Sequence, residues 1–265
     1  MTNEYLKKNR KNKVNRRGIR IHTKWQQRFI ICLAIISTIC AVGLALKVIP
    51  YVSDIIAFRR EQTALPELSP FDAAWLEINP DYVGWLKIDD TIVDFPVVRG
   101  NDNEKYLYTT FRGNENILGA IFMDYRCVGE NMPHIIIYGH QVDNMDGNIF
   151  MFGGLNKFLD EQYMADHPII MFMANSNLFE FEIYSARITD ISDPAYQLDF
   201  NAPDSFKVFI ERNGSPDDAL QIITLSTCDG ADNERRMIVQ GALKRIVPIR
   251  AEYAEEDGWT IVKPK

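Results

Sequence analysis

The chain has 265 residues, of which 46% are hydrophobic and 25% charged, a composition that is typical of a globular protein and excludes a disordered one. The net charge is −7, but residues 1–28 contribute +9 through ten Lys or Arg and one Glu, which leaves −16 for the remainder. A body this acidic argues against a main domain that binds nucleic acid, because its net negative charge repels phosphates.

The first predicted element is an apolar segment, FIICLAIISTICAVGLAL, over residues 29–46. Such a run can cross a bilayer as a helix, so we predict a transmembrane signal-anchor over residues 29–47. The cations of residues 1–28 place that tail in the cytoplasm and the body outside the cell, in a single-pass cell-membrane protein. The tail is also suited to contact anionic lipid. A cleaved signal peptide, a nucleic-acid arm and a buried helix are the alternative interpretations.

A linker is predicted over residues 48–70. Residues 51–64 have helical spacing, and Pro66 and Pro70 end that helix. Residues 71–76 predict a second short helix. The main domain is expected over residues 71–250, and a polar C-terminal tail over residues 251–265.

The main domain is predicted to be mainly β, a barrel or sandwich with inserted helices, because short strand-like runs separated by turn signals outnumber helical patterns. The predicted strands are 83–88, 91–98, 117–123, 134–138, 168–173, 178–188, 220–225 and 236–247. The predicted helices are 147–164 and 204–212.

Cysteine chemistry is possible at Cys228, which ends the apolar run QIITLSTC just before a turn signal, Asp229-Gly230. A nucleophilic thiol needs that exposure and a cation or base nearby. A packed small hydrophobe is the ordinary alternative for a strand-end cysteine. In an exported body, a disulfide between Cys127 and Cys228 is another.

Two further segments contain candidate partners for this cysteine. The strand HIIIY runs into Gly139-His140, which puts His140 at the point where a strand gives way to a loop. Arg235 and Arg236 open the strand that follows Cys228. Alternation along that strand turns only one of the two toward the thiol, and a guanidinium there would suit a developing oxyanion.

Three short motifs, in this order, resemble the class B members of the sortase family: YGH at 138–140, TLSTC at 224–228 and RMIV at 236–239. The resemblance covers residues 75–247 and includes the opening NPDYVGW at 79–85, although Gln141 departs from the usual Asn or Arg. It implies a closed sortase-type β-barrel with peripheral helices as the catalytic domain, and no cofactor. The sequence shows no metal-binding loop of oxygen ligands either.

The resemblance also implies a reaction in which the chain acts as a cysteine transpeptidase, sharing chemistry with cysteine proteases and other hydrolases. Cys228 would attack the threonine carbonyl of a C-terminal Pro-x-Thr-type sorting signal, and His140 would act as general acid and then base. Arg236 would hold the oxyanion, while Thr227 and Ser226 would support the substrate. A peptidoglycan amine would then resolve the thioacyl intermediate, which anchors surface proteins to the cell wall of Gram-positive bacteria.

Two other functions stay open at this point. A membrane-anchored cysteine peptidase that only hydrolyses would use the same three residues, and a non-catalytic surface binding module would need none of them. The substrate signal is not readable from the sequence. We expect residues 189–216, between two predicted strands, to set substrate selectivity.

Overall fold

The computed structural model describes residues 24–65, 69, 73–129, 132–143, 149–228, 235–248, 250–254 and 258–262. The chain divides into two compact units, residues 1–52 and 53–265.

Helix α2, Lys24–Thr63, contains the predicted apolar segment. Within the first unit its large apolar side chains, such as Phe29, Ile39 and Leu46, are exposed. Within the described residues, Gln27–Thr63 is the one stretch of helix long and apolar enough to cross a bilayer, and an 18-residue window within it has a mean hydropathy of 2.7. The prediction of an N-terminal apolar helix that is a candidate transmembrane span is therefore confirmed.

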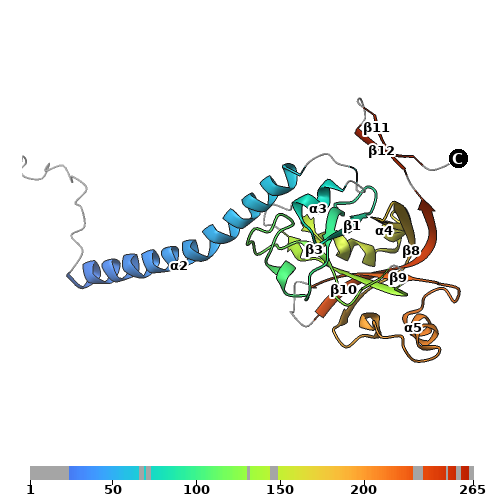
Figure 1. Ribbon diagram of the computed structural model, residues 1–265. Helices are drawn as coiled ribbons and strands as arrows, with labels where there is room; N and C mark the ends of the chain where they lie inside the picture. Colours follow the sequence, from blue (N-terminus) through green and yellow to red (C-terminus); the bar gives the residue numbers. More distant parts are fainter. Residues whose placement is uncertain are drawn as a thin grey trace, which may run out of the picture. The chain divides into compact units, whose positions relative to one another are not determined.

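Eight strands of the second unit close into a barrel, in the order β1-β2-β3-β4-β9-β10-β8-β7 (Figure 1). These strands are β1 Tyr82–Lys87, β2 Asp94–Val98, β3 Ile121–Met123, β4 His134–Tyr138, β7 Ile169–Ala174, β8 Asn177–Asp190, β9 Ile222–Cys228 and β10 Arg235–Pro248. The pairs β2/β3 and β4/β9 are parallel, and the other neighbours are antiparallel. The prediction of a mainly β protein with a closed barrel is confirmed.

The barrel core follows from the alternation of side chains along its strands. Ile135 and Ile137 of β4 and Ile223 and Leu225 of β9 are buried in one apolar cluster inside the barrel. The residues between them therefore project to the outer side of the barrel wall. This parity decides which residues near the ends of β4 and β9 can meet outside the core.

Peripheral elements surround the barrel, as the resemblance implies. They are α3 Ala74–Ile78, the 3-10 helices η1 Lys105–Leu107, η2 Gly153–Leu159 and η3 Pro194–Tyr196, and the helices α4 Glu161–Asp166 and α5 Ser205–Asn213. The helix predicted over residues 204–212 corresponds to α5. Phe209 and Ile210 of α5 pack in one apolar cluster with Ile222 of β9 and Ala242 of β10, and Figure 1 shows α5 outside the barrel.

The last turns of α2 belong to the second unit and pack on it. Ile55 and Phe58 are buried there. The Glu61 carboxylate accepts hydrogen bonds from the Thr110 hydroxyl and from the backbone N–H of Arg112, both at 2.9 Å. These contacts stabilise the last turns of the helix, because its apolar side chains are buried and the Glu61 carboxylate is hydrogen-bonded. The helix therefore continues to Thr63.

The structure adds detail to two expectations from the sequence, of which the helix over residues 147–164 is wrong. The helix predicted over residues 147–164 is instead strand β6 Ile149–Met151, the 3-10 helix η2 and the short α4. Gly153 and Gly154 disfavour a continuous α-helix. Among the regularly spaced apolar residues of this segment, Phe152, Leu155 and Phe158 are buried, whereas Leu159 is 47% exposed. Strand β6 pairs with β5, Gln141–Asp143. A polar tail was expected from residue 251, but β11 Arg250–Ala254 and β12 Gly258–Val262 pair there.

Candidate active site

The candidate active site lies where β9 ends and β10 begins. Cys228 is the last residue of β9, and Arg236 is its register partner in the antiparallel β10. The side chain of Cys228 is outside the described part of the chain, so its backbone pairing defines its position. Directly opposite residues of an antiparallel pair lie about 5 Å apart at Cβ and share a face. The pairing therefore brings Cys228 and Arg236 together.

The choice between the two arginines follows from this register. The pairs Thr224–Gln240 and Ser226–Ile238 continue regularly to Cys228–Arg236, with no register shift between them. Arg235 is one residue away and so projects to the other face. In the antiparallel pairing of β10 with β8, Arg235 lies opposite Asp190.

His140 reaches the same end of the barrel from β4, the other neighbour of β9. Tyr138 is the parallel partner of Ser226, and His140 and Cys228 each stand two residues further along. The Gly139 N–H donates to the Ser226 carbonyl at 3.2 Å, which extends this ladder. Cys228 and Arg236 thus lie opposite each other on β9 and β10, and His140 stands just past the end of β4, at the same end of the barrel.

Close packing against the core explains why the residue before His140, Gly139, is a glycine. A Cβ at this position would lie 2.4 Å from Cδ1 of Ile121 and 2.9 Å from the ring of Phe152. Because both neighbours belong to the core, a larger residue would push the backbone outward. The glycine therefore lets the chain turn close to the core immediately before His140.

The imidazole of His140 is half-buried and oriented by a backbone group. Its Nε2 lies 2.8 Å from the carbonyl oxygen of Leu107, at the end of η1. A carbonyl oxygen only accepts hydrogen bonds, so Nε2 carries a proton. In the neutral ring Nδ1 is then the acceptor, and it is the nitrogen available for proton transfer.

Ser226 and Thr227 occupy the two faces of β9 just before the cysteine. The Ser226 hydroxyl is 2.8 Å from the hydroxyl of Tyr196, in η3. Thr227 projects toward the interior, and its buried hydroxyl finds no hydrogen-bond partner among the described residues. A buried hydroxyl without a partner is costly, so Thr227 is a polar group with unmet hydrogen-bonding capacity next to Cys228.

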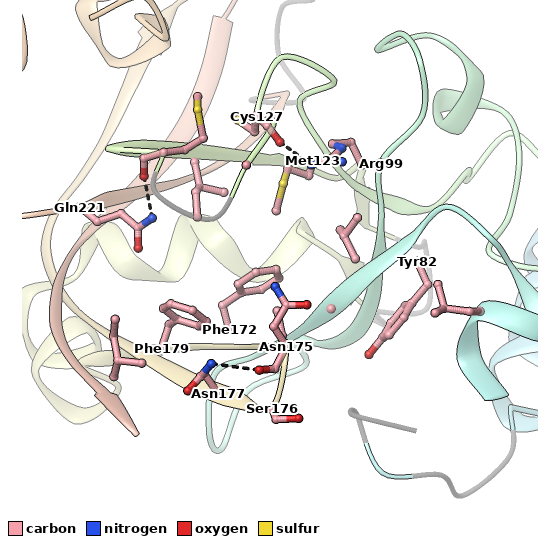
Figure 2. A pocket seen from close by; sticks show the side chains of 18 of the residues that line it. Tyr82, Arg99, Met123, Cys127, Phe172, Asn175, Ser176, Asn177, Phe179 and Gln221 are labelled. Atoms are coloured by element: carbon pink, nitrogen blue, oxygen red, sulfur yellow. Dashed lines mark hydrogen bonds between the residues drawn. The ribbon is translucent and has the colours of Figure 1, made fainter. Parts of the chain in front are cut away.

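Cys127 lies far from this site, in a pocket of about 830 Å³ at the opposite end of the barrel. Figure 2 shows Met123 and Arg99 beside it, with the Arg99 guanidinium bonded to the Cys127 carbonyl at 2.5 Å. Phe172 and Phe179 form the facing wall. Burial raises the pKa of the Cys127 thiol to about 11, so this sulfur is a poor nucleophile at neutral pH.

The same position rules out a disulfide between Cys127 and Cys228. The Cys127 sulfur lies 3.8 Å from the carbonyl oxygen of His134, the register partner of Ile222. Cys228 is six residues further along β9, or about 20 Å at the rise of a strand. Disulfides need Cα atoms within roughly 7 Å, and Cys127 is a free thiol.

His134, the first residue of β4, is part of the barrel wall. Its Nδ1 donates to the Gln197 carbonyl at 2.7 Å, and its Nε2 accepts from the Thr224 hydroxyl at 2.8 Å. Complete burial lowers the pKa of His134 to about 4, so the ring is neutral at physiological pH. Both nitrogens are engaged, which leaves His140 as the histidine with a nitrogen available at the site.

Leu107 and Tyr196 contact the predicted site residues but were missed by sequence reasoning. Leu107 acts through its backbone carbonyl, to which side-chain chemistry gives no clue. Tyr196 lies within residues 189–216, where selectivity was expected, but only the fold brings its hydroxyl to Ser226. Neither residue stands in a motif that contains the cysteine, histidine or arginine.

The closed eight-stranded barrel, with Cys228 at the end of β9, Arg236 opposite it on β10 and His140 two residues past the end of β4, is the arrangement that the resemblance to sortases implies. The profile of the Sortase domain family matches residues 86–244, more than half of the chain. The chain therefore belongs to the sortase family, the cell-wall sorting transpeptidases.

Named relatives and solved structures agree on the class. Sortase B of Listeria monocytogenes is 33% identical over 179 residues, covering 63% of this chain and 71% of the relative. Sortase B of Staphylococcus aureus is 30% identical over 182 residues, covering 64% and 73%. The Staphylococcus aureus sortase B–substrate complex has a TM-score of 0.58 at 28% identity, covering 67% of this chain and 84% of that one. The sortase B structure from Listeria monocytogenes has a TM-score of 0.55 at 31% identity, covering 65% and 100%.

Proposed function

We propose that this sortase cleaves a Pro-x-Thr-type C-terminal sorting signal after the threonine and transfers the protein to a peptidoglycan amine. Cys228 is the nucleophile, His140 the general acid and base, and Arg236 the oxyanion donor. The observation that supports this assignment is that Cys228 ends β9, Arg236 is its register partner on β10, and His140 follows β4, the other neighbour of β9.

The first half-reaction forms the thioacyl intermediate. The Cys228 thiol gives its proton to Nδ1 of His140, and its sulfur attacks the threonine carbonyl carbon. The C–N bond to the next residue then breaks, which leaves the threonine carbonyl bonded to sulfur as a thioester. A proton passes from His140 to the departing amine, since an amide nitrogen leaves only when protonated. Nδ1 is the donor in this step, because Nε2–H stays on the Leu107 carbonyl.

The second half-reaction returns the enzyme to its starting state. The acceptor amine attacks the thioester carbon and gives a proton to Nδ1 of His140, while the C–S bond breaks and an amide forms. The proton then passes from Nδ1 to the released sulfur, which regenerates the Cys228 thiol and the neutral imidazole. Arg236 offers planar N–H donors to the oxyanion that develops in both half-reactions. A guanidinium suits this role because it remains charged at any working pH.

Substrate and acceptor are proposed from the relatives and from the polar groups beside Cys228. A Staphylococcus aureus sortase B has been solved with substrate, and a sortase B has been solved in complex with triglycine. An oligoglycine supplies the kind of primary amine that the second half-reaction requires. The Thr227 hydroxyl and the Ser226–Tyr196 pair support substrate binding near the nucleophile, and residues 189–216 set selectivity.

Anchoring completes the proposal. Residues 1–28 form the cytoplasmic tail in contact with anionic lipid, residues 29–47 the single membrane span and residues 48–70 the stalk. Residues 71–250 form the extracellular catalytic domain, followed by a polar C-terminal segment at 251–265 that contains the paired strands β11 and β12. The exposed apolar surface of α2 and the cations before it support this orientation.

An acceptor experiment tests the function. A fluorogenic peptide with a Pro-x-Thr signal is incubated with the detergent-solubilised chain, with and without triglycine, and the products are identified by mass spectrometry. A transpeptidase forms the peptide–triglycine conjugate in an acceptor-dependent manner. Cleavage that never yields conjugate supports a peptidase instead. A binding module would bind peptide without cleaving it, and Cys228→Ala would not change that binding.

A further inference from the structure

The histidine side chains of the described residues fall into two groups by their hydrogen bonds. His134 and His167 each place Nδ1 on a backbone carbonyl, that of Gln197 at 2.7 Å and that of Tyr163 at 2.8 Å. His140 alone among them places Nε2 on a carbonyl, that of Leu107 at 2.8 Å. The carbonyls dictate the proton positions, so His140 is the Nε2–H tautomer and the other two are Nδ1–H tautomers.

The Leu107 carbonyl is held by the short helix that it ends. Within η1, the buried Tyr106 donates its hydroxyl to the Asp81 carboxylate at 2.7 Å and accepts from Nδ2 of Asn79 at 3.1 Å. Lys105 pairs with the same Asp81 carboxylate at 2.6 Å. Two adjacent residues of one helical turn are thus fixed to the segment that leads into β1.

Gly119 packs against the other side of η1. The Ala120 N–H donates to the Tyr106 carbonyl at 3.0 Å. A Cβ at Gly119 would lie 2.2 Å from the Tyr106 oxygen and 2.7 Å from the Leu107 oxygen. Gly119 also has a φ of +58°, which other residues rarely adopt. The Leu107 carbonyl is therefore fixed from both sides.

We propose that the Leu107 carbonyl sets the tautomer of His140 and stabilises its imidazolium, with Tyr106 as the positioning residue for that carbonyl. In Ser-His-Asp enzymes a buried carboxylate holds the histidine in its working tautomer and stabilises the charged ring. Here a backbone carbonyl fills that role, and the Tyr106–Asp81 hydrogen bond keeps it in place. The catalytic part of this inference rests on the proposed function of His140.

The tautomer is read directly by nitrogen NMR. The full chain is labelled with ¹⁵N-histidine in detergent, and long-range proton–nitrogen spectra are recorded above pH 8. His140→Gln assigns the His140 signals, and His134 and His167 are internal references for the opposite tautomer. We expect the Nε2–H pattern for His140. An Nδ1–H pattern in the unmodified chain overturns the proposal, whether or not the chain transfers peptides.

Tyr106→Phe tests the positioning role, with Tyr108→Phe as the matched control. Tyr108 is in the same loop and is 61% exposed. We expect Tyr106→Phe to mix the two tautomers of His140 and to lower kcat between roughly 10- and 100-fold while KM stays within about twofold. Tyr108→Phe should leave the spectrum and kcat unchanged. A folded Tyr106→Phe protein with the pure Nε2–H pattern and unchanged kcat contradicts the role of Tyr106.

An ester in place of the amide between Leu107 and Tyr108 tests the carbonyl itself and does not depend on the Tyr106 variant. An ester carbonyl is a weaker acceptor, and the Tyr108 side chain is retained. We expect a lower kcat and a loss of the pure Nε2–H signature in a chain whose circular dichroism is unchanged. The same ester between Tyr108 and Thr109 is the control. Equal kcat and spectra for both esters and the unmodified chain overturn the proposal.

Discussion

Cys228 and Arg236 are direct register partners across β9 and β10, while Arg235 projects to the opposite face of the sheet. This relationship predicts which guanidinium serves the reaction. Arg236→Ala should lower kcat/KM by about 100-fold or more, which is the usual cost of losing an oxyanion donor. Arg236→Lys should recover only part of the loss, because an ammonium lacks the planar fork.

Arg235→Ala is the comparison for this prediction. It removes the same charge from the adjacent position, so a purely electrostatic steering effect would lower kcat/KM of both variants alike. We expect less than about a threefold change in kcat/KM for Arg235→Ala. Steady-state kinetics with the fluorogenic peptide separate the outcomes, and equal losses for the two variants would contradict the register argument.

The two cysteines of the second unit are predicted to behave in opposite ways. Cys228→Ala should abolish both cleavage and conjugate formation, with a melting temperature close to that of the unmodified chain. Cys127→Ala should retain activity, because its sulfur lies at the other end of the barrel and its pKa is raised to about 11 by burial. Trapping of the thioacyl species by mass spectrometry checks this, and activity in Cys228→Ala would refute the nucleophile.

Acid should destabilise the fold through His134. Its pKa is lowered from 6.5 to about 4 by burial, so between these values the unfolded chain binds a proton that the folded chain does not. Stability is therefore highest above pH 6.5 and is lost as the pH falls toward 4, by about 3 kcal/mol from this group alone. Protonation would also remove the acceptor that Nε2 offers to the Thr224 hydroxyl.

Denaturant unfolding at pH 7 and pH 4.5 measures this effect in detergent. His134→Gln should be less stable at pH 7 but should lose less stability on acidification than the unmodified chain. His167→Gln is the control, because this ring is only part-buried at the end of α4. An identical pH dependence in the His134→Gln chain would show that other groups govern acid unfolding.

The hydroxyl pair of Tyr196 and Ser226 should couple the segment of residues 189–216 to the nucleophile strand. The two oxygens are 2.8 Å apart, and a neutral hydrogen bond of this kind contributes about 1 kcal/mol. Tyr196→Phe and Ser226→Ala should each lower kcat/KM about fivefold, and the double variant should cost little more than either. Additive losses in this double-mutant cycle would mean that the contact has no role in activity.

The local sequence was sufficient to predict those helices and strands whose pattern lies within a few neighbouring residues. The apolar run of residues 29–46, the eight barrel strands and α5 follow from periodicity and composition, because side-chain burial imposes a period on each element. Periodicity failed over residues 147–164, where buried apolar side chains recur at helical spacing but two glycines divide the segment. In this segment the spacing of apolar residues indicates that some of them are buried, but it does not determine whether the backbone is helical.

By itself, the sequence determined the candidate residues, since Cys228, His140 and Arg236 stand at the ends of recognisable strands in motifs of one family. Only the tertiary structure decided their relations. It selected Arg236 over Arg235 by strand register, separated Cys127 from Cys228 by the length of a strand, and fixed the proton of His140 on Nε2. Each of these depends on residues tens of positions apart, because barrel closure and backbone carbonyls act through space and leave no local pattern in the chain.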